Sequence, residues 1–150
     1  MRKSNKIVMC IPFRKKEDGY EFLLLKRLAA RGSFWQPAGG RVEATDSSEL
    51  EAAYRELHEE TGIPKENVIR AIEKFHSFKF DKHYLTGKPI PVITVTVYGF
   101  EVRQDVEIHF SNNQEKPEHE GFIWVSFDQA LELLKWENNK DSFRKLKELL

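Results

Sequence analysis

The sequence predicts an α/β (α+β) fold in which a mixed β-sheet is sandwiched between α-helices. The first observation behind this prediction is the order of the segments. They run as strands, one helix, strands and then helices, instead of alternating strictly as in an all-parallel fold. The second is size, because 150 residues that are 40% hydrophobic can bury one core, whereas two domains would each be too small. We therefore expect a single domain over residues 1–150.

The N-terminal part is expected to form a β-hairpin followed by an irregular stretch. Residues 6–13 and 20–27 have strand character, and the polar residues between them, with Gly19, suit a tight turn. Residues 31–40 contain glycines and a proline, which interrupt regular structure, namely Gly32, Pro37, Gly39 and Gly40. We therefore predict neither strand nor helix in this stretch.

A capped helix is predicted next. Ser47 or Ser48 can cap its N-terminus, and Gly62 is well placed to end it. Its apolar side consists of residues spaced three and four apart, namely Leu50, Ala53, Tyr54 and Leu57.

The second half of the chain is expected to complete the sheet and to add two helices. Residues 68–80 and 90–102 predict two long strands, and residues 122–125 a short one. Helices are predicted over residues 127–134 and 140–150.

The charge balance and the single cysteine limit the binding partners and the cellular compartment that we expect. The 24 basic and 24 acidic side chains give a formal net charge of zero, so we expect no stable complex with nucleic acid, which needs many phosphate contacts. The apolar run 7–13 is too short for a membrane span or a signal peptide, and Cys10 within it has no partner for an intramolecular disulfide. We therefore expect a cytoplasmic monomer or homodimer without membrane contact, in which Cys10 fills the core.

Three glutamates on the predicted helix form the first candidate site. Glu56, Glu59 and Glu60 are spaced so that their carboxylates share one face of the helix, away from its apolar side. Their mutual repulsion weakens an isolated helix. A solvated acidic face is one interpretation of this pattern. The other is a site for a hard divalent cation such as magnesium, which takes oxygen ligands and would offset the repulsion.

The residues around the glutamates favour the cation site. A glycine loop, residues 39–43 (GGRVE), leads into the helix, and residues 61–63 (TGI) end it. Residues 40–63 thereby resemble the Nudix box, in which a glycine, a loop glutamate, an Arg-Glu pair, two more glutamates and a final glycine recur at fixed spacing. The matching residues are Gly40, Arg55, Glu56, Leu57, Glu59, Glu60, Gly62 and Ile63. The resemblance implies a Nudix hydrolase with the Nudix fold.

The loop departs from the box at one position. Five residues separate Gly40 from Asp46, which stands where the family has glutamate. Eight residues, instead of the seven in the family, separate Asp46 from Arg55. In the family this loop carboxylate pairs with the arginine and locks the loop to the helix. Asp46, Glu43 and Glu49 are all candidates for that pairing here.

The resemblance also implies roles for individual residues. Glu56, Glu59 and Glu60, with the carbonyl group of Gly40, are implied to bind Mg²⁺, or Mn²⁺ in its place. The metal would lower the pKa of a bound water, and Glu59 would orient or deprotonate it. Arg55 would complete the catalytic arrangement by holding the loop.

A second acidic cluster extends these roles. The Glu-His pair at Glu118 and His119, followed by a tryptophan and a short helix, is similar to the C-terminal half of two Nudix groups. These are the dinucleoside tetraphosphate hydrolases and the deoxyadenosine triphosphate pyrophosphohydrolases. The similarity implies that Glu118 is a further metal ligand or base, with Glu120 as the alternative. The histidines are too scattered in sequence to predict a zinc site.

By the same resemblance the substrate is a small nucleotide, either a nucleoside triphosphate or a dinucleoside polyphosphate. Residues 20–25 look like the tetraphosphate hydrolases, whereas residues 136–139 look like the pyrophosphohydrolases. The candidate substrate contacts are Arg27, Trp35, Arg41 and Tyr84, although packing or solvation would also explain each of them. Nucleotide sugars, capped RNA and pterin triphosphates are alternative substrates, and a non-catalytic nucleotide-binding domain is the alternative class of protein.

Overall fold

The computed structural model describes residues 4–109 and 119–150. In chain order its elements are β1 (Lys6–Lys16), β2 (Gly19–Arg27), the 3-10 turn η1 (Ala29–Arg31), β3 (Trp35–Gln36), β4 (Ala38–Arg41), α1 (Glu49–Thr61), the 3-10 turn η2 (Lys65–Asn67), β5 (Val68–Lys82), β6 (Pro89–Val102), β7 (His119–Val125), α2 (Phe127–Leu133) and α3 (Glu137–Leu149).

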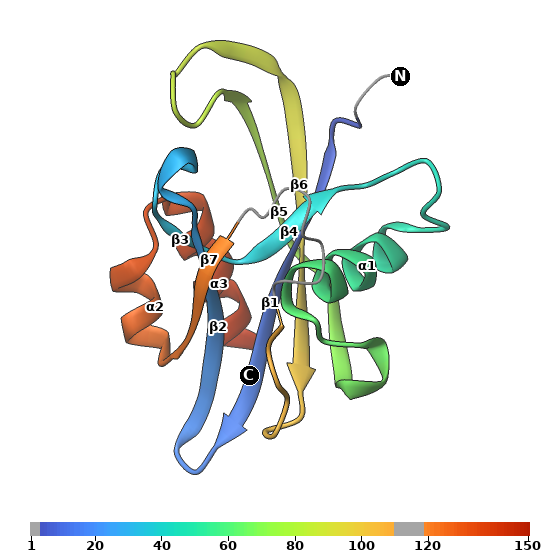
Figure 1. The fold of residues 1–150 in the computed structure, drawn as a ribbon, viewed down its shortest axis with the longest axis vertical. Coiled ribbons are helices and arrows are strands. Elements are labelled where there is room, and N and C mark those ends of the chain that lie inside the picture. The colour runs from blue at the N-terminus through green and yellow to red at the C-terminus, as the bar shows by residue number, and fades with distance from the viewer. Residues whose placement is uncertain (1–3, 110–118) are drawn as a thin grey trace.

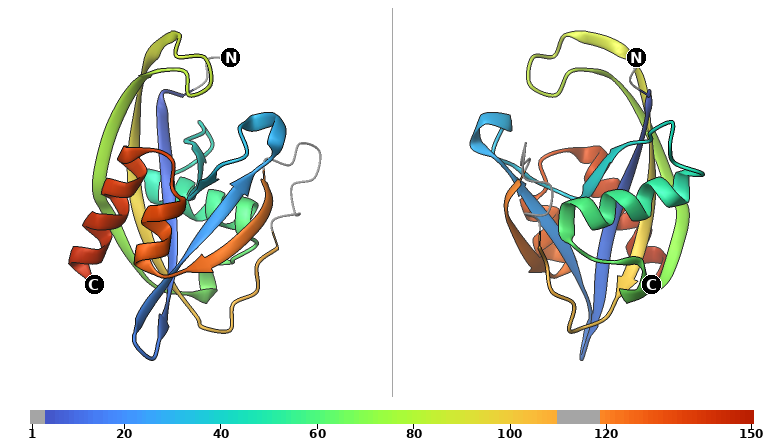
Figure 2. Two further views of the ribbon diagram at one scale, coloured as in Figure 1. Left: turned by 90° about the vertical axis from the view of Figure 1, so that its left-hand side faces the viewer. Right: turned by 45° about the vertical axis from the view of Figure 1, so that its right-hand side comes forward.

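The strands form one mixed sheet, as predicted. Its order is β3-β2-β1-β6-β5, while β4 pairs with β1 and β7 pairs with β2. β1 and β6 run parallel, and the other pairs are antiparallel. Helix α1 covers one face, and α2 and α3 cover the other (Figures 1 and 2). The α+β architecture with helices on both sides is therefore confirmed.

Alternation along β1 explains why the sheet needs helices on both faces. Val8 and Cys10 lie in the apolar cluster that contains Leu57 of α1. Ile11 and Phe13 lie in a second cluster, with residues of α2 and α3. All four β1 side chains are fully buried, because successive strand residues point to opposite faces and both faces are covered. Burial raises the pKa of the Cys10 thiol well above its ordinary value, consistent with a core role.

Both predicted ends of α1 are confirmed. The Ser48 hydroxyl accepts a hydrogen bond from the amide of Glu51 at 3.1 Å, which satisfies one of the free N–H groups of the first turn. Gly62 ends the helix with a φ of 76°, and its N–H donates to the carbonyl of His58 at 2.8 Å. These caps fix the start and end of the helix, and so the direction in which its glutamates point.

The prediction of an irregular stretch over residues 31–40 is wrong in part. Trp35–Gln36 and Ala38–Arg41 are short strands, and β4 pairs with β1 through partners such as Cys10 and Ala38. A side chain on Gly39 would run into the backbone of Val8 and Met9. The glycine therefore permits a close strand crossing here and does not break the strand. Two other elements begin earlier than predicted: β7 begins at His119 instead of residue 122, and α3 begins at Glu137 instead of residue 140.

The hairpin of β5 and β6 extends past the rest of the sheet and arches over at its end (Figure 1). Its tip, residues 83–88, bends back toward the segment that follows β2. There the ring of Tyr84 meets that of Phe34 edge to face, with centroids 5.9 Å apart. The long-strand predictions for this region are confirmed. Within residues 4–109 and 119–150, no helix is long and apolar enough to cross a membrane.

Candidate active site

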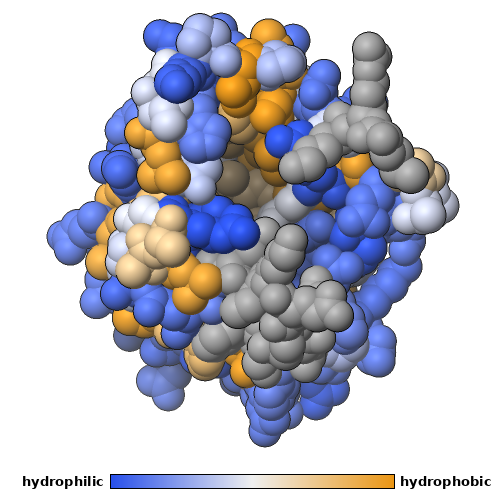
Figure 3. Space-filling view, turned by 45° about the horizontal axis from the view of Figure 1, so that its top comes forward, coloured by the Kyte–Doolittle hydropathy of each residue, from blue (hydrophilic) through white to orange (hydrophobic). Residues whose placement is uncertain are grey.

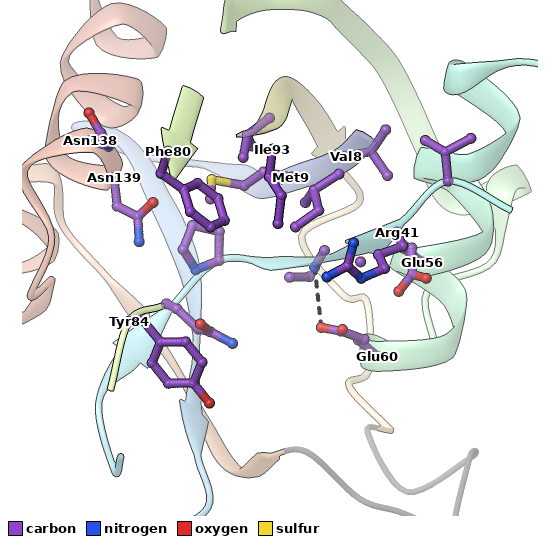
Figure 4. A pocket seen from close by; sticks show the side chains of 18 of the residues that line it. Val8, Met9, Arg41, Glu56, Glu60, Phe80, Tyr84, Ile93, Asn138 and Asn139 are labelled. Carbon is purple, nitrogen blue, oxygen red and sulfur yellow. Dashed lines mark hydrogen bonds between the residues drawn. The ribbon is translucent and has the colours of Figure 1, made fainter. Parts of the chain in front are cut away.

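An open cleft of about 1630 Å³ runs between two walls. One wall consists of β4 and the glutamate face of α1, and the other contains the β5–β6 tip and the start of α3. Figure 3 looks onto this end of the molecule, where apolar side chains gather beside strongly polar ones around a hollow. Figure 4 shows the two ends: Glu56, Glu60 and Arg41 at one, and Asn139, Phe80 and Tyr84 at the other. The cleft therefore has an acidic end and an aromatic end.

Three of the glutamates of α1, Glu56, Glu59 and Glu60, line the acidic end. Glu56 is only 7% exposed, and the side chain of Glu60 is 11% exposed. The backbone N–H of Gly39 donates to Glu60 Oε2 at 3.2 Å, which is the bond drawn in Figure 4. Because carboxylates are rarely buried without a partner, the interpretation as a solvated acidic face does not fit.

Gly40 explains how β4 can lie so close to α1. A Cβ atom at this position would collide with the carboxylate of Glu56. Only glycine lets the strand backbone approach the acid this closely. The missing side chain leaves a cradle between backbone and carboxylate, of the kind that a small hard cation requires.

Arg55 joins the loop to the acidic end. Its Nε and Nη2 bond to the two oxygens of Asp46 at 2.8 and 2.9 Å, and Nη2 also bonds to the carbonyl of Arg41 at 3.0 Å. Its Nη1 bonds to Glu56 at 2.7 Å and to Glu59 at 3.2 Å. The guanidinium beside Asp46 lowers the pKa of that carboxyl, and the same hydrogen bonds raise the pKa of Arg55.

The structure decides which acid pairs with Arg55. Asp46 makes the two-pronged pair, whereas Glu43 lies 3.6 Å from Nη1 and Glu49 bonds to Lys74 at 3.2 Å. Asp46 is held in place because one of its oxygens accepts from the amide of Glu43 at 2.7 Å. The additional loop residue and the shorter acid thus offset each other, and the link between loop and helix is kept.

The donor set fits a hard cation, although no three metal-binding side chains converge within residues 4–109 and 119–150. Arg55 holds Glu56 and Glu59, and Glu60 accepts from the backbone of Gly39. The acids are therefore held by the protein's own donors. Their oxygen chemistry and the cradle at Gly40 match what magnesium prefers, which is one or two carboxylates with water and phosphate completing the shell.

At the aromatic end, Arg27 lies between two rings. Its guanidinium carbon is 5.8 Å from the ring centroid of Phe34 and 5.3 Å from that of Tyr84, within the range of cation–π attraction. Nη2 donates to the Tyr84 hydroxyl at 3.4 Å. Nε is buried and has no hydrogen-bond partner among the described residues. A bound group with an acceptor atom would satisfy it.

The structure brings most of the predicted site residues together. Those that line the cleft are Arg27, Gly40, Arg41, Glu56, Glu59, Glu60 and Tyr84. Trp35 is not among them: it forms a bridge with Leu134 and packs in the cluster around α2 and α3. Its neighbour Phe34 faces the cleft instead. Glu118 lies outside the described residues, and Glu120 is exposed on β7 and does not line the cleft.

Sequence reasoning missed the pair formed by Gln36 and His119. His119 is 5% exposed, its Nε2 lies 2.9 Å from Gln36 Nε2, and its Nδ1 lies 3.8 Å from Glu60 Oε2. Burial, together with the nearby charges of Arg27 and Arg31, lowers the pKa of His119 to about 4. The imidazole is therefore neutral at neutral pH. The sequence signal that could have pointed to His119 was its position next to Glu118.

Comparison with known proteins places these features in a family. The family model of the NUDIX domain matches residues 3–146. The chain is 34% identical over 122 residues to the bis(5'-nucleosyl)-tetraphosphatase [asymmetrical] of Rattus norvegicus, covering 80% of this chain and 74% of that one. It is 30% identical over 137 residues to the RNA pyrophosphohydrolase of Pelagibacter ubique, covering 83% and 82%. A match of 33% over 125 residues to an octanoyltransferase of Myxococcus xanthus covers 82% of this chain but only 31% of that longer protein.

Solved structures show the same fold. A protein described as a NUDIX hydrolase from Listeria monocytogenes superposes with a TM-score of 0.76 at 26% identity, covering 95% of this chain and 91% of that one. The Ap4A hydrolase of C. elegans superposes with a TM-score of 0.75 at 21% identity, covering 96% of each chain. The dihydroneopterin triphosphate pyrophosphohydrolase of E. coli gives 0.76 at 21% identity, covering 100% and 99%. The last two likenesses concern the fold alone.

Proposed function

This chain belongs to the NUDIX domain family, and from that premise we propose that it is a hydrolase that cleaves a phosphoanhydride bond of a nucleoside polyphosphate. The observation that carries the proposal is the acidic end of the cleft. Three carboxylates lie there against a glycine strand, and an arginine holds two of them in place. We further propose that the chain works as one domain in the cytoplasm, as a monomer or homodimer.

The residues that would hold a divalent cation are Glu56, Glu59, Glu60 and the carbonyl of Gly40. Mg²⁺ is the ion that this donor set favours, and Mn²⁺ has the same preference for oxygen ligands. When bound, such an ion neutralises charge on phosphate oxygens and lowers the pKa of a coordinated water.

The chain's own residues divide the remaining work. Glu59, the most exposed of the three acids with 38% of its side chain accessible, is placed to orient the attacking water or accept its proton. Arg55 is a positioning residue, because it holds Glu56 and Glu59 and ties Asp46 to them. Arg41 lies at the acidic end and Arg27 at the aromatic end, so both can bind phosphates. Glu118 remains a proposed second base.

The substrate that we propose first is a dinucleoside polyphosphate or a nucleoside triphosphate. The rat and Pelagibacter relatives support a nucleotide substrate, since their names specify a dinucleoside tetraphosphate and an RNA pyrophosphate. The size of the cleft supports it as well, because about 1630 Å³ exceeds the roughly 300–1,000 Å³ typical of small-molecule pockets. A molecule with two nucleosides joined by phosphates would use this larger space.

The test is a hydrolysis screen with Mg²⁺ in which each product is identified by mass. The panel contains deoxynucleoside triphosphates, dinucleoside polyphosphates, nucleotide sugars, capped RNA and a pterin triphosphate. We expect Glu59→Gln to lower kcat by about a hundredfold or more, because it removes a group that acts on the attacking water. Glu51→Gln is the control, since Glu51 is on the same helix but pairs with Lys65 outside the cleft. Equal activity of Glu59→Gln and wild type would refute the assignment, and no turnover of any compound would favour a non-catalytic binding domain.

A further inference from the structure

An irregular step in the pairing of β2 with β7 brings His119 into the cleft. The register is regular as far as Lys26, opposite Gly121, and then shifts so that Arg27 lies opposite His119 instead of Glu120. Opposite residues of neighbouring strands share a face of the sheet, so the shift changes which side chain accompanies Arg27. Arg27 and His119 both line the cleft, and Glu120 does not. The bulge between β2 and β7 therefore selects the histidine for the cleft wall.

Strand β3 places the amide of Gln36 against this imidazole. Gln36 lies opposite Leu25 of β2, two residues before Arg27, and so faces the same side of the sheet as His119. Its Nε2 is 2.9 Å from Nε2 of His119. An amide nitrogen can only donate, so the histidine Nε2 accepts the bond and carries no proton. The buried imidazole is neutral at neutral pH, and a neutral ring has one N–H, so the proton lies on Nδ1.

The N–H of His119 faces the carboxylate of Glu60. Nδ1 lies 3.8 Å from Glu60 Oε2, and the same oxygen accepts from the backbone N–H of Gly39 at 3.2 Å, the bond drawn in Figure 4. A separation of 3.8 Å is longer than a hydrogen bond. The side chains of His119 and Glu60 are only 4% and 11% exposed, however, so water screens the attraction between them little. Oε2 of Glu60 is therefore held from two sides, by β4 and by β7.

Packing alone does not account for this arrangement. An apolar pair of similar size would fill the space of Gln36 and His119 without the cost of burying polar atoms. Groups that hold a metal-binding carboxylate from behind fix its orientation, and their loss commonly weakens metal binding by about 10–100-fold. The series from Gln36 through His119 to Glu60 has the form of such a support, because each donor in it is directed toward the carboxylate.

We propose that Gln36 and His119 are positioning residues for the cation site. Gln36 fixes the proton of His119 on Nδ1, and the resulting N–H holds the carboxylate of Glu60 in the orientation that a divalent cation requires. The inference rests on the proposed function, since that function assigns Glu60 to the cation. A neutral donor suits this task because it orients Glu60 without adding a positive charge, so the carboxylate still attracts a cation fully.

The first experiment locates the proton on His119 by nitrogen-15 NMR of histidine-labelled protein. The method distinguishes a protonated from an unprotonated ring nitrogen, and the signals that are missing in His119→Phe identify this residue. We expect a protonated Nδ1 and an unprotonated Nε2 in the wild type. A proton on Nε2 instead would overturn the proposal.

Gln36→Met tests whether the amide selects this tautomer. Methionine keeps the length of the side chain but removes the donor, so the signals of His119 should move toward a mixture of the two tautomers. Gln104→Met is the matched control, because Gln104 is exposed and does not line the cleft. An unchanged tautomer in Gln36→Met would overturn the role of Gln36.

Mn²⁺ binding tests whether the N–H of His119 acts on the cation site. In His119→Asn the amide nitrogen can take the place of Nδ1 and still donate toward Glu60, whereas in His119→Gln the longer amide reaches the position of Nε2. We expect His119→Phe and His119→Gln to weaken Mn²⁺ binding by about tenfold. His119→Asn should bind within about threefold of the wild type. Equal affinities of the Asn and Gln variants, or wild-type affinity in His119→Phe, would overturn the proposal.

Melting temperatures separate positioning from packing. His119→Asn and His119→Gln both bury an amide in place of the ring, so we expect them to lose similar stability and yet to differ in Mn²⁺ affinity. Affinities that follow the melting temperature across the three variants would assign His119 to the core and overturn the proposal.

These outcomes stay separate from the hydrolysis test, because the tautomer and Mn²⁺ binding are measured without substrate. The predicted order of Mn²⁺ affinities without turnover of any compound would refute the proposed reaction and leave the positioning role standing. Turnover that requires Glu59, together with unchanged Mn²⁺ affinity in His119→Phe, would do the reverse.

Discussion

The two ends of the cleft differ in how far the protein satisfies its own polar groups. At the acidic end, Arg55 alone bonds to Asp46, Glu56, Glu59 and the carbonyl of Arg41. At the aromatic end, the buried Nε atom of Arg27 has no hydrogen-bond partner among the described residues. We therefore propose that the acidic end is arranged in advance for the reaction, whereas a ligand completes the hydrogen bonds at the aromatic end. Changes at the acidic end should therefore affect both stability and rate, and changes at the aromatic end mainly affinity.

The largest effect is expected from Arg55→Gln. It removes the guanidinium that pairs with the carboxylates of Asp46 and Glu56, and both of these side chains are at most 10% exposed. We expect the free energy of unfolding to fall by about 3 kcal/mol, the cost of breaking a buried ion pair. Urea unfolding measures this, and kcat should fall in parallel. Arg144→Gln is the control, because that exposed arginine pairs with Glu137 and Asp141 at the surface and should contribute under about 1 kcal/mol. Equal stability of the two variants would contradict the conclusion that the bonds of Arg55 to the surrounding acids stabilise the fold.

A smaller effect on stability and a selective one on activity are expected from Gly40→Ala. The added methyl group collides with the Glu56 carboxylate and should displace it, lowering kcat/KM by about tenfold or more. Gly121→Ala on β7 is the matched control, since its Cβ would meet nothing within 4 Å. Steady-state kinetics of the two variants give the comparison. If both behaved alike, the close approach of β4 to α1 would not matter for function.

The Asp46–Arg55 pair also makes stability depend on pH. The pKa of Asp46 is lowered in the folded state, so its stabilisation is fully present above its unfolded value of about 3.9 and is lost as the pH falls through the lower folded value. The difference in unfolding free energy between the wild type and Asp46→Asn should therefore shrink on acidification from about pH 5 to about pH 3. A difference that stays constant over this range would contradict the pairing.

The smallest effect is expected at Tyr84 in the aromatic end. Tyr84→Phe removes a hydroxyl that only weakly contacts Arg27, at 3.4 Å. KM should rise by no more than about threefold and kcat should not change, because the ring itself remains against Phe34. A fall in kcat at constant KM would place Tyr84 in the chemistry and weaken the contrast between the two ends.

Local rules were sufficient for much of this molecule. The caps of α1 at Ser48 and Gly62, and the alternation of the long strands, depend on neighbours within a few residues, so the sequence reveals them. The glutamate face of α1 was predicted for the same reason. Recognition of the Nudix box then supplied the family, which the match over residues 3–146 confirms.

Features that depend on distant contacts were not predictable. Gly39 and Gly40 look like strand breakers, and only the approach of β1 and α1 shows why they lie within a strand. The choice of Asp46 over Glu43 depends on the path of the loop. Contacts with β2 and Leu134 decide which of Phe34 and Trp35 faces the cleft. The sequence alone could therefore not show that it is Phe34.

The most direct test of the central claim, that the acidic end binds a divalent cation, is a Mn²⁺ titration followed by electron paramagnetic resonance. We predict saturable Mn²⁺ binding that Mg²⁺ displaces and that Glu56→Gln weakens by about tenfold or more, in line with the loss of a carboxylate ligand. Tyr84→Phe, altered only at the aromatic end, should bind Mn²⁺ as the wild type does. No Mn²⁺ binding, or binding that Glu56→Gln leaves unchanged, would contradict the assignment of this end of the cleft as the metal site.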